Sequence, residues 1–104
     1  MAQNELDLDL DLDIIHPKMY KVILHNDDYS TFDFVIEVLM QIFNKNKDEA
    51  VDLTLKVDRE GYAVVGIYPK DIAETKVSLV KFMAKEAGYP LLATMEEEWI
   101  YQID

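Results

Sequence analysis

Hydrophobic residues recur along the chain with the spacings of three short strands and three helices. Apolar, β-rich runs at residues 19–24, 62–68 and 91–95 predict strands, with turn-forming residues beside them. Apolar residues three or four positions apart predict amphipathic helices over residues 31–43, from about 47 to 60, and over 72–87. The order β-α-α-β-α-β indicates a single small α+β domain, with three strands in one layer and helices in the other.

Polar residues and glycines predict where the helices begin and end. Ser30 fits the N-cap of the first helix. Asn46 and Glu49 have the spacing of a capping box at the start of the second helix. Gly61 and Gly88 fit the positions just after the second and third helices, where a left-handed backbone ends a helix.

The two ends of the chain differ from its middle. Leucine and aspartate alternate from Leu6 to Asp13, and residues 1–17 hold five of the 21 acidic residues but no Lys or Arg. We interpret residues 1–17 as an acidic N-terminal arm that is solvated until a partner is present, with a solubilising tail as the plainer alternative. Residues 18–98 are then the core domain and residues 99–104 a C-terminal tail.

Composition excludes several classes of function. The net charge of −11 argues against nucleic acid, because contacts to phosphates require a basic face. The lack of cysteine excludes a thiol nucleophile, a disulfide framework and a Cys-based zinc or iron–sulfur site. No apolar run approaches the roughly 20 residues that cross a membrane, and the acidic N-terminus is unlike a secretory signal. We therefore expect a cytosolic protein that contacts no membrane.

No pattern indicates catalysis or a cofactor. Ser30 has no obvious histidine partner, and no nucleophile motif surrounds it. His25, Asp27, Asp28 and Asp58 could bind a metal, but they lack the spacing of calcium or zinc sites. The three glycines are not clustered, so no phosphate-binding loop is expected. We therefore expect that the protein is not an enzyme and that it binds neither a metal ion nor a cofactor.

A recognition pocket is the function that the pattern favours. If the first two helices pack together, their facing residues form a small apolar pocket with an acidic, amide-bearing rim. Such a pocket suits a ligand with one ammonium group and one apolar side chain, as at the N-terminal residue of a polypeptide. The residues that would form it are Asn26 and Asp27 in the loop, Phe32 and Val35 on the first helix, and Thr54, Val57 and Asp58 on the second.

Six segments within residues 18–98 match one known family in the same order. They are Met-Tyr-Lys-Val-Ile-Leu (19–24), Asn-Asp-Asp-Tyr (26–29), Phe-Val-Ile-Glu-Val-Leu (34–39), Gly-Ile-Tyr (66–68), Ala-Glu-Thr-Lys-Val (73–77) and Pro-Leu-Leu-Ala-Thr-Met-Glu (90–96). Through these segments the chain resembles the ClpS family of adaptors, which deliver N-degron substrates to a Clp-type AAA+ unfoldase. The resemblance implies a three-stranded antiparallel sheet packed by three helices, a fold that also occurs in a ribosomal stalk protein.

The resemblance also implies which residues bind substrate and unfoldase. The family holds the substrate's α-amino group with an Asn, an Asp and a His; here they correspond to Asn26, Asp27 and, in place of the His, Asp58. Two pocket positions usually filled by Met are Phe32 and Thr54. The implied hydrophobic pocket is Ser30, Phe32, Val35, Thr54, Val57 and Leu91, and the implied docking surface for the unfoldase's N-terminal domain is Asp71, Glu74 and Lys76.

The resemblance predicts a monomeric adaptor in a bacterial cytosol or a plastid stroma. The N-terminal arm would engage the unfoldase, and the pocket would bind the substrate's first residue. Because Asp27 and Asp58 would repel each other in the empty pocket, we expect one of them to have a raised pKa. Two alternatives remain open: a ClpS-like modulator that docks without recognising N-degrons, and a generic interaction domain of the same fold.

Overall fold

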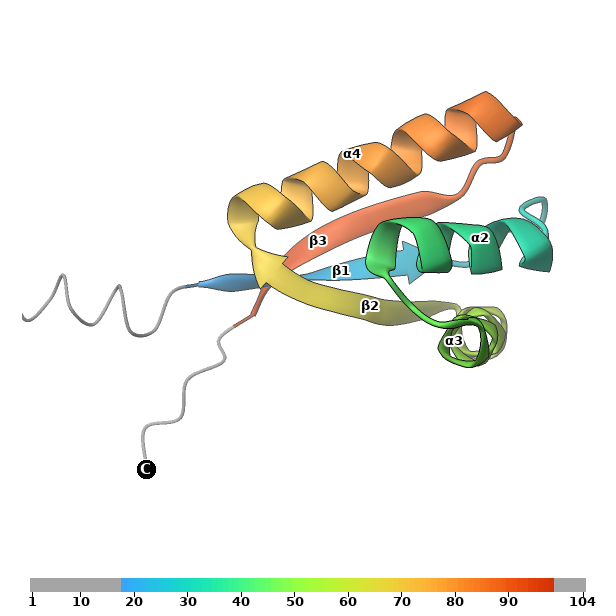
Figure 1. Ribbon diagram of the computed structural model, residues 1–104, viewed down its shortest axis with the longest axis horizontal. Coiled ribbons are helices and arrows are strands. Elements are labelled where there is room, and N and C mark those ends of the chain that lie inside the picture. Colours follow the sequence, from blue (N-terminus) through green and yellow to red (C-terminus); the bar gives the residue numbers. More distant parts are fainter. Residues whose placement is uncertain (1–17, 99–104) are drawn as a thin grey trace, which may run out of the picture.

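The computed structural model describes residues 18–98, in which three strands form one antiparallel sheet. The strands are β1 (Met19–His25), β2 (Tyr62–Pro69) and β3 (Leu92–Glu98), in the spatial order β2-β1-β3. The predicted β-α-α-β-α-β order and α+β fold are confirmed (Figure 1). The predicted arm (1–17) and tail (99–104) lie outside the described residues.

The three helices bury one face of this sheet. They are α2 (Phe32–Phe43), α3 (Lys47–Glu60) and α4 (Lys70–Ala87). Helix α4 packs across all three strands, whereas α3 packs on β2 and on α2 (Figure 1). Val22, Leu24 and Val65 of the strands are buried in the core, while Tyr62 and Val64 of β2 are exposed. The alternation in β2 therefore gives the sheet one covered and one open face.

The helix caps agree with the sequence at α3 but not at α2. Asn46 and Glu49 form the predicted capping box, and Gly61 ends α3 with a φ of 92°. The prediction that Ser30 caps α2 is wrong, because the Thr31 hydroxyl oxygen accepts from the Phe34 N–H at 3.1 Å. The Ser30 N–H instead donates to the Asp27 carboxylate, which keeps Ser30 in the preceding loop.

Two further element boundaries differ from the predicted ones by at least two residues. Helix α4 begins at Lys70 rather than Ile72, directly after Pro69 of β2. Strand β3 extends past Met95 to Glu98, although acidic residues are poor strand formers. Two ion pairs lie beside this extension: Lys21 Nζ of β1 is 3.6 Å from Glu98 Oε1, and Nζ of Lys18, just before β1, is 3.8 Å from Glu97 Oε2.

Candidate functional site

A cavity of about 270 Å³ lies where the β1–α2 loop meets α2, α3 and the segment before β3. All nine residues that the sequence suggests for substrate binding line this one cavity, together with two that it does not suggest. The predicted nine are Asn26, Asp27, Ser30, Phe32, Val35, Thr54, Val57, Asp58 and Leu91, and the additional two are His25 and Asp28.

The interior of the cavity is apolar. Val35, Val57 and Leu91 are buried, and they come from α2, α3 and the segment before β3. Thr54 is the only buried polar residue among those described. Its hydroxyl donates to the Ala50 carbonyl oxygen at 2.8 Å, so its donor is satisfied within α3. This interior therefore offers apolar contact with little demand for a polar ligand group.

Asp27 is held rigidly at the polar end of the cavity. Its Oδ1 accepts from the Tyr29 N–H at 2.8 Å and from the Ser30 N–H at 2.7 Å, which is the geometry of an Asx turn. Asp27 Oδ2 and the Ser30 hydroxyl oxygen are both buried, and neither has a hydrogen-bond partner within residues 18–98. A buried carboxylate oxygen left in this way favours a cationic donor.

The hydrogen bonds to Asp27 also set its charge. Burial raises the pKa of its carboxyl, but the Ser30 N–H, the nearby Ser30 hydroxyl and the Tyr29 N–H together outweigh burial, so the pKa lies below the ordinary value of 3.8. Asp27 is therefore ionised at neutral pH. The prediction that repulsion from Asp58 raises the pKa of one of the two acids is wrong for Asp27.

The rim of the cavity is acidic. Asp28 and Asp58 are exposed, and no Lys or Arg lines the cavity. The Asp58 carboxylate makes no hydrogen bond or ion pair with another residue of the described part, so it remains available at the mouth. Phe32 is 47% exposed, although the sequence pattern suggests a wall position.

His25 and Asp28 were not predicted as pocket residues. A ring nitrogen of His25, Nε2, lies 2.8 Å from the Thr94 hydroxyl of β3, within hydrogen-bond distance. The loop that carries Asn26 and Asp27 brings both neighbours to the cavity. Sequence adjacency to those two residues was the signal that could have identified them.

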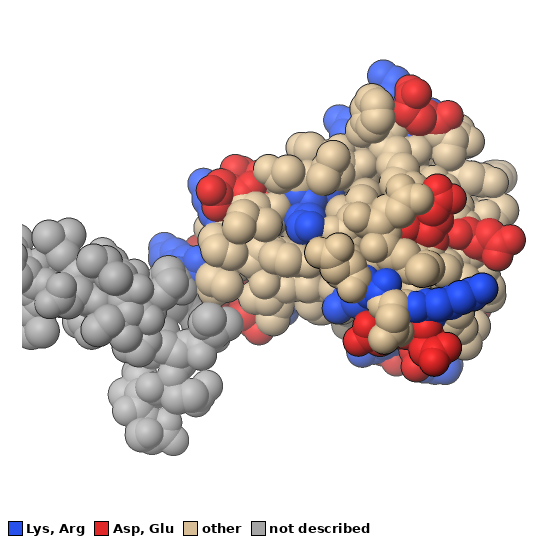
Figure 2. Space-filling model, viewed as in Figure 1, with Lys and Arg blue, Asp and Glu red and all other residues tan. Residues whose placement is uncertain are grey.

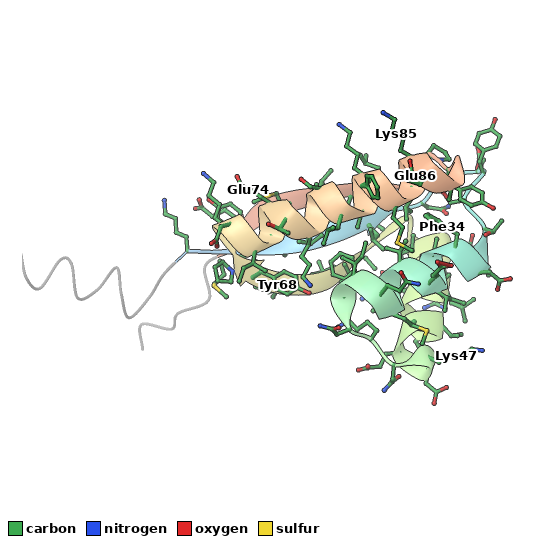
Figure 3. All side chains as sticks on the ribbon, turned by 45° about the horizontal axis from the view of Figure 1, so that its top comes forward. Phe34, Lys47, Tyr68, Glu74, Lys85 and Glu86 are labelled. Atoms are coloured by element: carbon green, nitrogen blue, oxygen red, sulfur yellow. The ribbon has the colours of Figure 1, made fainter. Side chains whose placement is uncertain are left out.

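The three predicted docking residues do not share one environment. Asp71 and Glu74 are exposed in the first turns of α4. Glu74 points away from the sheet in Figure 3. They lie at the Met19 end of β1, whereas the cavity lies at its His25 end, roughly 20 Å of extended strand away.

Lys76, by contrast, is half-buried and occupied within the domain. Its Nζ donates to the Ile42 carbonyl oxygen at 2.6 Å, in the last turn of α2, and lies 5.5 Å from the centre of the Tyr68 ring. A lysine near a helix C-terminus stabilises the carbonyls that have no partner there. Lys76 therefore joins α4 to α2 and β2, which sequence reasoning missed.

Neither a metal centre nor a spanning helix is found among residues 18–98. No group of three His, Asp or Glu residues there is arranged to hold a metal ion. No helix in the same range is long and apolar enough to cross a membrane.

Comparison with known proteins identifies relatives over most of the chain. Residues 15–94 match the family model described as "ATP-dependent Clp protease adaptor protein ClpS". The ClpS adapter of Nautilia profundicola is 60% identical over 87 residues, which cover 84% of this chain and 90% of that protein. The ClpS adapter of Wolinella succinogenes is 58% identical over 93 residues, covering 89% and 91%.

A solved structure shares both the fold and the sequence. Agrobacterium tumefaciens ClpS2, bound to L-phenylalaninamide, superposes with a TM-score of 0.77 at 44% sequence identity. The match covers 79% of this chain and 99% of that one.

Proposed function

Since the chain belongs to the ClpS family of ATP-dependent Clp protease adaptors, we propose that its cavity binds the free N-terminal residue of protein substrates. In this proposal the substrate's α-ammonium group contacts Asn26, Asp27 and Asp58, and a large hydrophobic first side chain enters the pocket. The adaptor then delivers the substrate to a Clp AAA+ unfoldase, acting as a monomer in the cytosol.

The observation that carries the proposal is the polarity of the cavity. Asp27 Oδ2 is buried without a partner within residues 18–98. The apolar part of the cavity is lined by the buried side chains of Val35, Val57 and Leu91. An N-terminal residue has the same division, because its ammonium group and its side chain leave the same carbon atom. One ligand can therefore satisfy the charge and fill the apolar space together.

A relative's ligand supports the choice of side chain. The solved Agrobacterium tumefaciens ClpS2 is bound to L-phenylalaninamide, which has a free α-amine and a benzyl side chain. Here Thr54 is buried inside the cavity and Phe32 stands half-exposed at its mouth. A short side chain inside leaves room for an aromatic ring, and the exposed Phe32 ring offers it an aromatic contact.

We propose that the unfoldase's N-terminal domain docks on the start of α4. Asp71 and Glu74 are exposed there, far enough from the cavity for substrate and unfoldase to bind together. Lys76 contributes mainly by holding α4 against α2, because its ammonium group already donates to Ile42.

Titration with L-phenylalaninamide tests substrate recognition directly. We expect saturable binding of the free amine, weakened by about 10- to 100-fold when the amine is acetylated, because a hydrogen bond between charged groups is lost. The Asp27→Asn variant should lose a similar factor, since the amide keeps the loop's hydrogen bonds but not the charge.

The matched control is Asp52→Asn, the same chemical change on the exposed side of α3. It should bind as the parent does. If the parent binds the free and acetylated compounds equally, N-terminal recognition is wrong. The better account would then be a modulator that docks on the unfoldase without recognising N-degrons. That alternative stays open because Asp58 stands where the family has a His.

A further inference from the structure

Helix α4 carries an apolar stripe on its solvent side. Ile72 and Leu79 are each 44% exposed and Phe82 is 65% exposed, at spacings of seven and three residues that bring them to one side of the helix. The opposite side of α4 buries Ala73, Val80 and Ala84 in the core. We call Ile72, Leu79 and Phe82 the α4 stripe.

Exposed charged groups of both signs flank the α4 stripe, and the lysines among them have no partner in the described part of the chain. In Figure 2 uncharged atoms cover much of the surface along α4, with charged groups at intervals among them. Lys70, Lys81 and Lys85 of α4 are exposed, and none forms an ion pair with another residue of the range 18–98. The acids Asp71, Glu74 and Glu86 are exposed on the same helix. Lys85 points away from the sheet in Figure 3.

We propose that the leucines of residues 6–13 of this same chain pack on the α4 stripe. Leu6, Leu8, Leu10 and Leu12 alternate with Asp7, Asp9, Asp11 and Asp13, and residues 1–17 contain no Lys or Arg. In an extended segment this alternation places the leucines on one side and the aspartates on the other. The leucines would cover the stripe, and the long side chains of Lys81 and Lys85 would extend past the edge of the segment toward the aspartates.

The path of the chain permits this contact. Met19 pairs with Pro69, and Pro69 directly precedes the first residue of α4. The chain therefore enters the domain beside the start of α4. Leu12 is six residues before Lys18, or about 20 Å of extended chain. The stripe from Ile72 to Phe82 is about 15 Å long, close to the roughly 20 Å between Leu6 and Leu12.

Charge separates this surface from the other exposed apolar one. The open face of the sheet exposes Tyr62, Val64 and Leu92. The lysine on that face, Lys21, is already paired with Glu98, and Glu96 lies opposite Lys21 in the sheet. An acidic segment would meet an excess of glutamate there, whereas α4 exposes as many lysines as acids, so the electrostatic preference is for α4.

The contact would connect the arm with unfoldase docking. Asp71 and Glu74, the proposed docking residues, lie in the first turns of the same helix. A domain that docks there would compete with residues 6–13, and docking would release the arm. This consequence rests on the proposed function, whereas the packing of the arm on α4 does not.

Paramagnetic relaxation in the full-length chain tests the packing without substrate or unfoldase. The chain contains no cysteine, so Asp9→Cys gives a single attachment point for a spin label. We expect broadening of the backbone amide signals of Leu79 and Phe82, and none at Tyr62 and Val64 on the open face. Broadening confined to the open face, or absent from α4, would overturn the proposal.

Three companion measurements define the contact. Leu8→Ser with Leu10→Ser should abolish the broadening at α4, and so should Lys81→Glu with Lys85→Glu. The control pair Lys47→Glu with Lys56→Glu makes the same charge change on α3 and should leave it intact. In a further sample, spin-labelled chains at natural isotope abundance are mixed with isotope-labelled parent chains, which have no cysteine and carry no spin label. No broadening is expected in this mixture. Broadening would mean that a second copy covers the stripe, and the proposal would be wrong.

Discussion

Asp27 is the residue whose geometry defines the polar end of the cavity. One carboxylate oxygen orders the loop through Tyr29 and Ser30, and the other is left for a ligand. A single side chain thus shapes the loop and supplies the negative charge. The lowered pKa keeps that charge in place over the whole neutral and mildly acidic range.

The lowered pKa of Asp27 predicts how its contribution to stability depends on pH. A depressed folded-state pKa stabilises the protein above the unfolded pKa, and this stabilisation is lost as pH falls through the folded value. The melting temperature of the parent should therefore exceed that of Asp27→Asn by a constant amount above about pH 5, and the gap should close below about pH 4. Thermal unfolding between pH 7 and pH 3 measures the gap, with Asp52→Asn as control. A gap that widens as pH falls would contradict this account.

Replacing Asp58 should weaken ligand binding less than replacing Asp27. Its carboxylate is exposed at the cavity mouth, so solvent screens its attraction for an ammonium group. Asp58→Asn should weaken binding of L-phenylalaninamide by about 1 kcal/mol, roughly fivefold. Asp58→His, which keeps an acceptor, should restore much of the loss. Calorimetric titration decides this, and parent-like binding by Asp58→Ala would make Asp58 a bystander.

The sequence predicted the pocket residues better than the local details of the loop. Helical spacing and the family resemblance placed Val35, Thr54 and Val57 on facing surfaces, and all of them line the cavity. Ser30 was wrongly predicted as a cap because Ser30 and Thr31 are both good N-caps by residue type; in the structure Ser30 belongs to the turn at Asp27, and the Thr31 hydroxyl caps the helix. Which of the two caps depends on the loop's three-dimensional path, which residue type alone does not reveal.

Among the secondary-structure elements, α4 has two different roles on its two sides. Its first turns expose Asp71 and Glu74, while Lys76 crosses to the last turn of α2. Gly66 makes part of this junction possible, since a Cβ there would overlap the Tyr68 ring beneath the Lys76 ammonium. The sequence predicted the helix but not this contact, because Lys76 and Ile42 are far apart in the chain and no local pattern links them.

Lys76→Met should therefore destabilise the fold. It removes a hydrogen bond from a charged donor and a cation–π contact, together worth about 1–3 kcal/mol. Chemical denaturation measures the loss. Lys56→Met, at an exposed position on α3, should change stability by no more than about 0.5 kcal/mol. If the two variants have equal free energies of unfolding, the contacts of Lys76 with Ile42 and Tyr68 do not stabilise the fold.

At the scale of the whole molecule, the cavity and the proposed docking surface lie at opposite ends of strand β1. The cavity lies at its His25 end and the exposed acids of α4 at its Met19 end. Figure 1 shows α4 running along the sheet between these two ends. Under the proposed function, this separation would leave room for a substrate and the unfoldase to bind at the same time.

Asp71→Lys with Glu74→Lys should therefore abolish binding to the unfoldase's N-terminal domain while leaving L-phenylalaninamide binding unchanged. Opposite charge on an exposed rim mainly disrupts complementarity with a partner. The matched control is Asp48→Lys with Asp52→Lys, which makes the same charge change near the start of α3. Surface-immobilised unfoldase domain provides the measurement. Retained binding by the first variant would place the docking surface elsewhere.

The most direct test of substrate recognition is a titration with four peptides of otherwise identical sequence, beginning with Phe or Asp and carrying a free or an acetylated N-terminus. The cavity's paired demands, a cation beside Asp27 and an apolar group beside Val35 and Leu91, predict that only the free Phe peptide binds well. Acetylation and the Phe-to-Asp change should each cost at least about tenfold in affinity. Equal binding of the free and acetylated Phe peptides would contradict recognition of a free N-terminus.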